Sequence, residues 1–129
     1  MNNILLSIII PTYNRPHFLP RAVNSALQQT MEEVEVIVVD DGSDEPVNLE
    51  EHPRLKVITL SKNSGNAVAR NVGLKAAKGQ YVTYLDDDDQ LLPNMAQVSL
   101  DALKNTTLPQ PVAALSGLEV IKPDGEVID

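Results

Sequence analysis

The 129-residue sequence predicts an α/β fold, a mostly parallel sheet flanked by helices. Three observations support this prediction. Short apolar runs alternate along the chain with segments of helical periodicity, which is typical of strand–helix–strand units. The apolar runs are continuous, as expected for strands buried on both faces. Polar motifs directly follow three of these runs, where open parallel sheets bind their ligands.

The first part of the chain predicts a strand, a helix and a second strand. Leu5 to Ile10 is an apolar run that ends at Pro11 and predicts a buried strand. Apolar residues between Leu19 and Leu27 recur at helical spacing, so we expect a helix covering that strand. Val34 to Val39 predicts a second buried strand, which the turn-forming residues Asp40 to Ser43 end.

The same alternation continues to the end of the chain. We expect a third strand at Val57 to Leu60, and a helix at Ala67 to Ala77 whose small residues allow close approach to the sheet. Tyr81 to Leu85 predicts a fourth strand, and spacing from Leu92 to Leu103 predicts a last helix. Two tail strands are expected at Val112 to Leu115 and Leu118 to Ile121, followed by a turn at Pro123-Asp124-Gly125.

Composition limits the classes of function. Residues 1–129 are enough for one compact domain, and 43% hydrophobic residues predict an ordinary buried core. The formal net charge of −8 leaves no basic face for nucleic acid. The absence of cysteine excludes disulfides, thiolate nucleophiles and zinc sites built on cysteine. The longest apolar run is too short to span a bilayer, so we expect a soluble cytoplasmic protein without a transmembrane segment.

Four aspartates follow the fourth predicted strand. In an extended segment Asp86 and Asp88 would point the same way, with Asp87 opposite. Carboxylates held in this way, together with waters and phosphate oxygens, form a normal Mg²⁺ or Mn²⁺ site. The alternative interpretation is a solvated acidic loop whose last aspartate caps the helix near Pro93.

The other polar motifs also allow two interpretations each. In Asp40-Asp41-Gly42-Ser43, a carboxylate could accept a hydrogen bond from a base or a ribose, or the motif could be a simple turn. Tyr13 could stack on a base, or close the end of the sheet. Arg70 should meet an anion, either a diphosphate or one of the aspartates. We interpret His17 and His52 as surface residues.

In this order and spacing, the motifs resemble those of the family 2 glycosyltransferases, an inverting group with the Rossmann-like GT-A fold. The resemblance extends from Leu6 to about Leu103, most of the chain. Its motifs are Ser7-Ile8-Ile9-Ile10-Pro11-Thr12-Tyr13-Asn14, Val36-Ile37-Val38-Val39-Asp40-Asp41-Gly42-Ser43, Asn63-Ser64-Gly65, Ala69-Arg70-Asn71-Val72-Gly73-Leu74, Ala77-Lys78-Gly79-Gln80-Tyr81 and Tyr84-Leu85-Asp86-Asp87-Asp88-Asp89.

The resemblance implies a role for each matching position. Asp41 matches the acid that hydrogen-bonds the nucleotide base, and Asp88 matches the direct metal ligand of a DXD-type motif. Asp86 or Asp87 would contact the ribose or the waters of the metal. The implied nucleotide-sugar-binding residues are Pro11, Thr12, Tyr13, Asp41, Arg70, Asn71, Asp86 and Asp87, and the implied metal-binding residues are Asp88 and Asp86.

The implied activity is metal-dependent transfer of a hexose, with inversion, from a nucleotide sugar to an acceptor hydroxyl. By resemblance the donor is a UDP-sugar, the metal is Mn²⁺ or Mg²⁺, and the acceptor is a saccharide or lipid-linked molecule of polysaccharide biosynthesis. A lipid-linked acceptor would bring a longer parent protein to the membrane periphery. The general base is expected beyond residue 129, so we expect the chain to be a single nucleotide-sugar-binding domain that ends before the acceptor-binding half.

Other classes fit less well. The first predicted strand is followed by Pro11-Thr12-Tyr13-Asn14, where a dinucleotide-binding oxidoreductase would need a Gly-x-Gly-x-x-Gly turn. A P-loop, the well-placed lysine of a receiver domain, and the glycine-rich basic loop of sugar nucleotidyltransferases are also missing. The remaining alternative is a non-catalytic nucleotide-binding fragment or interaction module.

Overall fold

A computed structural model describes residues 3–115, 117 and 119–128 of the chain. Backbone contacts divide the chain into two compact units, Met1–Ala96 and Gln97–Asp129. No helix within the described ranges is both long and apolar enough to cross a bilayer. The elements are β1 Leu6–Thr12, α1 Leu19–Leu27, β2 Val34–Asp40, β3 Leu55–Thr59, α2 Asn66–Ala76, β4 Tyr81–Tyr84, α3 Met95–Asn105, β5 Val120–Ile121 and β6 Val127–Ile128.

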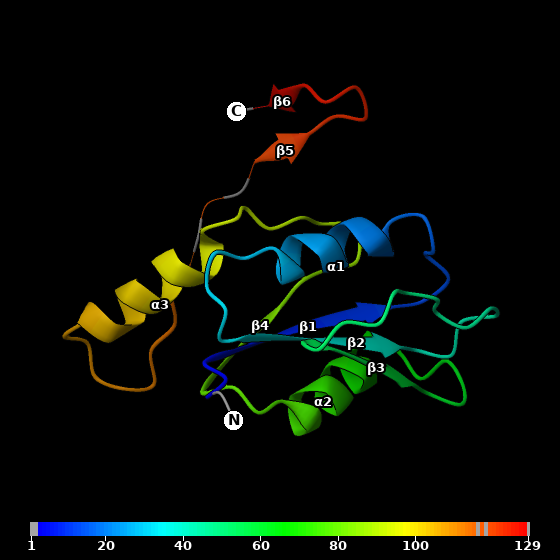
Figure 1. Cartoon of the computed structure of the whole chain (residues 1–129), viewed down its shortest axis with the longest axis horizontal. Helices are drawn as coiled ribbons and strands as arrows, with labels where there is room; N and C mark the ends of the chain where they lie inside the picture. Colours follow the sequence, from blue (N-terminus) through cyan, green and yellow to red (C-terminus); the bar gives the residue numbers. More distant parts are fainter. Residues whose placement is uncertain (1–2, 116, 118, 129) are drawn as a thin grey trace. The chain divides into compact units, whose positions relative to one another are not determined.

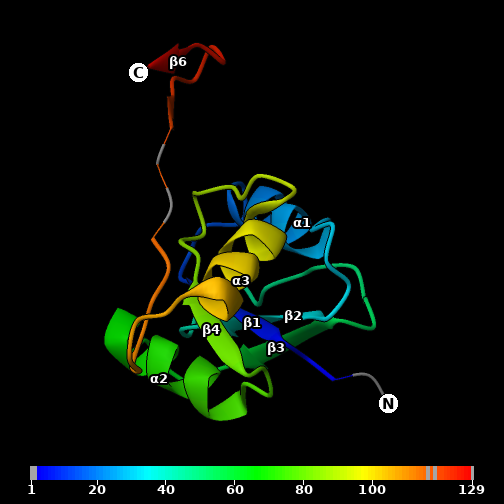
Figure 2. The ribbon, with the colours of Figure 1, turned by 90° about the vertical axis from the view of Figure 1, so that its left-hand side faces the viewer.

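The first unit is built on a parallel sheet with the strand order β3-β2-β1-β4. Strand β1 lies between two neighbours, so that Leu6 pairs with Val34 of β2 and with Tyr81 of β4. Helices α1 and α2 cover opposite faces of this sheet (Figures 1 and 2). The predicted α/β class, the parallel sheet and its two helical layers are therefore confirmed.

Strand β1 extends beyond the proline that was expected to end it. Its hydrogen bonds alternate between neighbours: the carbonyl of Ile9 accepts from Leu85, next to β4, and that of Thr12 accepts from Asp41, next to β2. Pro11 therefore faces the β4 side, where strand pairing has already stopped at Tyr84. A missing N–H costs little at that position, so the strand continues to Thr12.

Helix α2 approaches the sheet closely through its small residues. Ala69 packs with Ile9, Ile37 and Val39 in one buried cluster. A Cβ atom added to Gly73 would lie only 2.4 Å from Cγ2 of Ile9. The expected close approach is thus confirmed, and it fixes the distance between α2 and the strands that carry the polar motifs.

We expect Gly73→Ala to lower the free energy of unfolding, although alanine is the better helix former. Helix propensity favours alanine by about 1 kcal/mol, whereas overpacking a full core costs roughly 1–3 kcal/mol. The net loss should therefore be about 1 kcal/mol, measured by urea unfolding. Asn71→Ala, on the exposed side of the same helix, is the matched control and should be neutral or slightly stabilising. A stabilised Gly73→Ala variant would contradict the close packing.

The second unit contains an antiparallel hairpin in which β5 pairs with β6. The expected turn is confirmed, and Gly125 adopts a positive φ of 89° there. The predicted strand at Val112 to Leu115 is wrong, because these residues form no regular structure and Leu115 is 97% exposed. Apolar character alone does not make a strand without a partner to complete its hydrogen bonds. Of the other predicted tail strand, β5 confirms the last two residues, and Leu118 lies outside the described residues.

Candidate functional site

A pocket of about 530 Å³ opens at the carboxyl ends of β1, β2 and β4. This is the edge of a parallel sheet at which ligands are expected. Loops that follow four different strands contribute to it, so residues far apart in the sequence meet there. Its lining consists of Pro11, Thr12, Tyr13, Arg15, Asp41, Asn63, Gly65, Asn66, Asp86, Asp87 and Asp88.

The end of β1 supplies one wall of the pocket. Pro11 and Thr12 are buried, whereas the Tyr13 ring is 41% exposed beside the cavity. The Thr12 hydroxyl donates a hydrogen bond of 2.8 Å to Oδ2 of Asp87. Thr12 therefore ties the aspartate segment to the central strand, and Tyr13 presents an aromatic surface to a ligand.

The two aspartates that end β2 have different surroundings. Asp40 is fully buried and accepts hydrogen bonds from the backbone N–H groups of Ser43 and Val47, as a turn-forming residue does. The Asp41 carboxylate instead accepts from the N–H groups of Ser64 and Gly65 and from the side-chain amide of Asn63. Asp41 thus holds the segment after β3 against the pocket.

The aspartate run divides between a buried and an exposed side. Asp87 turns inward to Thr12, as its predicted opposite orientation requires. The segment is nevertheless a turn and not the extended chain that was expected, because the Asp89 N–H donates to the carbonyl of Asp86. Consequently Asp89 joins Asp86 and Asp88, and carboxylate oxygens of all three lie within 4.8 Å of one another. Three exposed carboxylates of this kind could hold a hard divalent cation.

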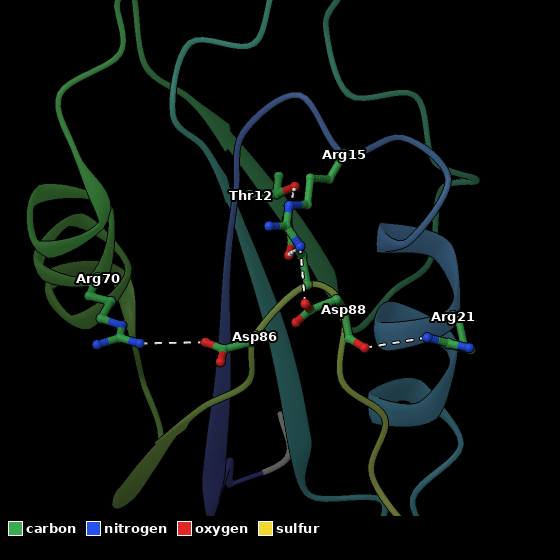
Figure 3. A network of polar contacts seen from close by, with 7 residues as sticks. Thr12, Arg15, Arg21, Arg70, Asp86 and Asp88 are labelled. Atoms are coloured by element: carbon green, nitrogen blue, oxygen red, sulfur yellow. Dashed lines mark hydrogen bonds and ion pairs between the residues drawn. The ribbon is translucent and has the colours of Figure 1, made fainter. Parts of the chain in front are cut away.

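Arginines lie beside Asp86 and Asp88 (Figure 3). Nη1 of Arg15 lies 3.0 Å from Oδ2 of Asp88 and 3.7 Å from Oδ1 of Asp87. Arg21, on α1, donates to the main-chain carbonyl of Asp88 over 3.3 Å. Both arginines follow β1 in the sequence, so their positive charges offset part of the negative charge of the aspartates that follow β4.

Arg70 was expected to meet an anion. Its guanidinium lies 3.5 Å from Oδ1 of Asp86 and stacks 5.5 Å from the centre of the Tyr84 ring. Its neighbour Asn71 is exposed on α2. Neither Arg70 nor Asn71 is among the residues that line the pocket, and Arg70 reaches its edge through Asp86. Of the two histidines, His17 is exposed as expected, and half-buried His52 accepts a hydrogen bond from the backbone of Arg54.

Burial and mutual repulsion affect the acids of the run. Desolvation raises the pKa of Asp87, opposed by the hydrogen bond from Thr12 and the charge of Arg15. The pKa of Asp89 is also raised, first by desolvation and then by the neighbouring charges of Asp88 and Asp86. Ionisation of these aspartates is therefore less favourable than in water, and a bound cation would stabilise their ionised form.

The raised pKa of Asp87 predicts a pH dependence of stability. Native Asp87 keeps its proton to a higher pH than the unfolded chain, so the free energy of unfolding falls as the pH rises from 3.8 through the raised pKa. Asp87→Asn cannot titrate and should lack this component. Urea unfolding between acid and neutral pH, without divalent cations, measures the difference between the two proteins. Parallel pH profiles would contradict the raised pKa.

Four of the lining residues have no role that the sequence predicts: Arg15, Asn63, Gly65 and Asn66. Asn63 and Gly65 belong to one of the family motifs, Asn63-Ser64-Gly65. Arg15 follows the motif at the end of β1 directly, and a basic residue there was the available signal. Its partner, Asp88, is distant in sequence, so only the fold brings the two together.

Comparison with known proteins identifies the family. The sequence profile described as Glycosyl transferase family 2 matches residues 7–114. A protein of Haemophilus influenzae named "Uncharacterized glycosyltransferase" is 41% identical over 95 residues, which are 69% of this chain and 38% of that protein. A chondroitin synthase of Pasteurella multocida is 36% identical over 131 residues, covering 96% of this chain and 13% of the relative. The chain thus spans well under half the length of these relatives.

Solved structures agree with this assignment. S. aureus TarS 1–349 in complex with UDP superposes with a TM-score of 0.64 at 32% identity, over 78% of this chain and 31% of that chain. The same protein in complex with UDP-GlcNAc gives 0.62 at 33% identity, over 78% and 30%. This chain belongs to the family 2 glycosyltransferases and shares their GT-A fold.

Proposed function

We propose that this chain is the donor-binding part of an enzyme that transfers a sugar from a UDP-sugar to an acceptor hydroxyl, with inversion and with a divalent cation. One observation carries the proposal: a single pocket has an aromatic ring and a loop-organising aspartate at the ends of β1 and β2, and a cluster of carboxylates after β4. A nucleoside diphosphate needs these two environments, one for the base and one for charged phosphates.

The base would lie between the ends of β1 and β2. Tyr13 offers a face for stacking, and Asp41 offers carboxylate oxygens beside Asn63 and Gly65. Pro11 would form the apolar floor. The complexes of S. aureus TarS with UDP and UDP-GlcNAc support uridine as the base.

The diphosphate would lie toward the aspartate run. Asp88 and Asp86 would hold Mn²⁺ or Mg²⁺, which supplies electrostatic stabilisation of a departing diphosphate when bound. Asp87, fixed by Thr12, would orient the segment, and Arg70, which α2 holds beside Asp86, would bind phosphate oxygens. Asn71, the next residue of α2, would have to reach the same phosphates from the exposed side of the helix. With the leaving group stabilised in this way, no carboxylic acid has to protonate it.

The second substrate and the catalytic base belong to the proposal as well. We expect a saccharide or lipid-linked acceptor in polysaccharide biosynthesis, at the cytoplasmic side of a membrane, and a general base that is not among the residues lining this pocket. The chondroitin synthase among the relatives supports a polysaccharide product. A non-catalytic nucleotide-binding module is the competing function, and measured sugar transfer or donor hydrolysis would exclude it.

Calorimetric titration of the 129-residue chain with UDP tests the donor site. We expect binding in the presence of Mn²⁺ that EDTA weakens strongly, because the cation screens the carboxylates from the diphosphate. GDP and CDP serve as controls for the base. Equal binding with Mn²⁺ and with EDTA would overturn the metal-dependent site, and preference for another nucleotide would replace UDP as the donor nucleotide.

A further inference from the structure

The guanidinium of Arg15 lies beside the carboxylate of Asp88, for which a bound metal ion would compete. Its Nη1 atom is 3.0 Å from Oδ2 of Asp88 and 3.7 Å from Oδ1 of Asp87. Asp88 also belongs to the carboxylate cluster whose oxygens lie within 4.8 Å of one another. A divalent ion coordinated by Asp88 would therefore stand within a few ångströms of a guanidinium. Two like charges at that distance repel each other, so Arg15 and the ion compete for this carboxylate.

The surroundings of Arg15 allow it to move. Its side chain is 48% exposed, and among the described contacts its stacking on Phe18 is loose, with 5.8 Å to the ring centre. Arg15 lines the pocket on one side and a neighbouring cavity of about 410 Å³ on the other. A long side chain between two open spaces can leave Asp88 without disturbing the buried core, and it remains on the wall of the pocket.

Arg21 provides an internal comparison. It has the same charge and comes from the same β1–α1 region, but it donates to the main-chain carbonyl of Asp88 and not to the carboxylate. A metal on the carboxylate oxygens leaves that carbonyl available. Arg70 also faces a carboxylate of the cluster, but over 3.5 Å to Oδ1 of Asp86, whereas Arg15 lies 3.0 Å from Oδ2 of Asp88. Arg15 is therefore the arginine with the shorter ion pair to a carboxylate of the cluster.

We propose that Arg15 is a counter-ion of Asp88 that a divalent cation displaces, and that the freed guanidinium then binds the diphosphate of the donor. This inference rests on the proposed function, since it concerns the same metal and the same phosphates. In the absence of metal and donor, the positive charge of Arg15 would reduce the repulsion among the three clustered carboxylates. It also implies that cation and donor bind with positive coupling, because each favours the displaced position of Arg15.

Two titrations of the intact chain with Arg15→Gln test the exchange. Without nucleotide, Mn²⁺ followed by electron paramagnetic resonance should bind the variant roughly tenfold more tightly than the wild type, since its competitor is gone. With saturating Mn²⁺, UDP followed by calorimetry should bind the variant roughly tenfold more weakly, since a charge-assisted hydrogen bond is lost. Damage to the fold would weaken both, so the opposite directions are diagnostic.

The matched control is Arg21→Gln, which removes the same charge but leaves the carboxylate of Asp88 without change. We expect it to alter Mn²⁺ affinity by less than about threefold, as a nearby exposed charge does. Mn²⁺ binding that is equal or weaker in Arg15→Gln overturns the exchange, while metal-dependent UDP binding by the wild type would still uphold the proposed function. If Arg15→Gln binds UDP with saturating Mn²⁺ as tightly as the wild type, Arg15 does not bind the diphosphate. A wild type that binds no Mn²⁺, with or without UDP, overturns both proposals.

Discussion

Asp88→Asn should weaken UDP binding in the presence of Mn²⁺ by at least about 100-fold, since even outer-shell partners of a metal site contribute 10–100-fold. An asparagine offers a neutral oxygen in place of a charged one, so the cation loses its strongest partner in the cluster. Calorimetry with Mn²⁺ measures the loss. With EDTA the variant should bind UDP no more weakly than the wild type, because the cation is absent from both and the variant has one repelling carboxylate fewer.

The fold should survive this substitution. The Asp88 side chain is 46% exposed, and its removal relieves repulsion within the cluster. Glu50→Gln, which neutralises an exposed carboxylate outside the pocket lining, is the control for net charge and should leave UDP affinity unchanged. If Asp88→Asn bound UDP with Mn²⁺ as tightly as the wild type, another group would have to hold the metal.

Gly42→Ala should lower the free energy of unfolding by roughly 2–5 kcal/mol, the sum of backbone strain and overpacking. Gly42 has a φ of +74°, which is costly for any residue with a Cβ atom. Its Cβ would also lie 2.5 Å from the carbonyl carbon of Lys62 and 2.6 Å from the nitrogen of Asn63, both main-chain atoms. The backbone after β3 would have to move away, so UDP affinity should fall together with stability.

The two causes can be separated with Gly65→Ala. Gly65 lies in the same compact unit and also has a positive φ, +98°, but a Cβ there would meet nothing within 4 Å. This control should therefore lose only the conformational part, about 1–3 kcal/mol. Urea unfolding gives both values, and equal losses in the two variants would show that Gly42 is not packed against the Lys62–Asn63 backbone.

The two central strands were predictable from sequence because β1 and β2 are short apolar runs with polar ends, buried almost throughout. The outer strands β3 and β4 are partly exposed and less continuously apolar. β2 was predicted to within one residue, since Val34 to Val39 is entirely buried apart from one position. The tail was less predictable, because Val112 to Leu115 has the apolar character of a strand but pairs with no strand that the structure describes. Strand formation depends on pairing contacts that a local apolar pattern does not contain.

The composition of the site was partly predictable. Strand ends converge in a parallel sheet, so Thr12, Asp41 and the aspartate run were expected together. The hydrogen bonds were not predictable: the bond from Thr12 to Asp87 spans 75 positions, and that from Arg15 to Asp88 spans 73. Asp89 lies in the carboxylate cluster because residues 86 to 89 form a tight turn, whereas the sequence predicts an extended segment there.

The central position of β1 has a consequence for folding kinetics. Its second neighbour, β4, is separated from it by a helix, two strands and another helix. Pairing of β1 with β4 therefore has to bring together two segments that are far apart in the sequence, which costs loop-closure entropy. The same late pairing delivers the aspartate run to Thr12 and Arg15. During refolding, Mn²⁺ uptake should therefore appear only with the final phase, and the cation should slow unfolding of the completed sheet while leaving earlier steps unaffected.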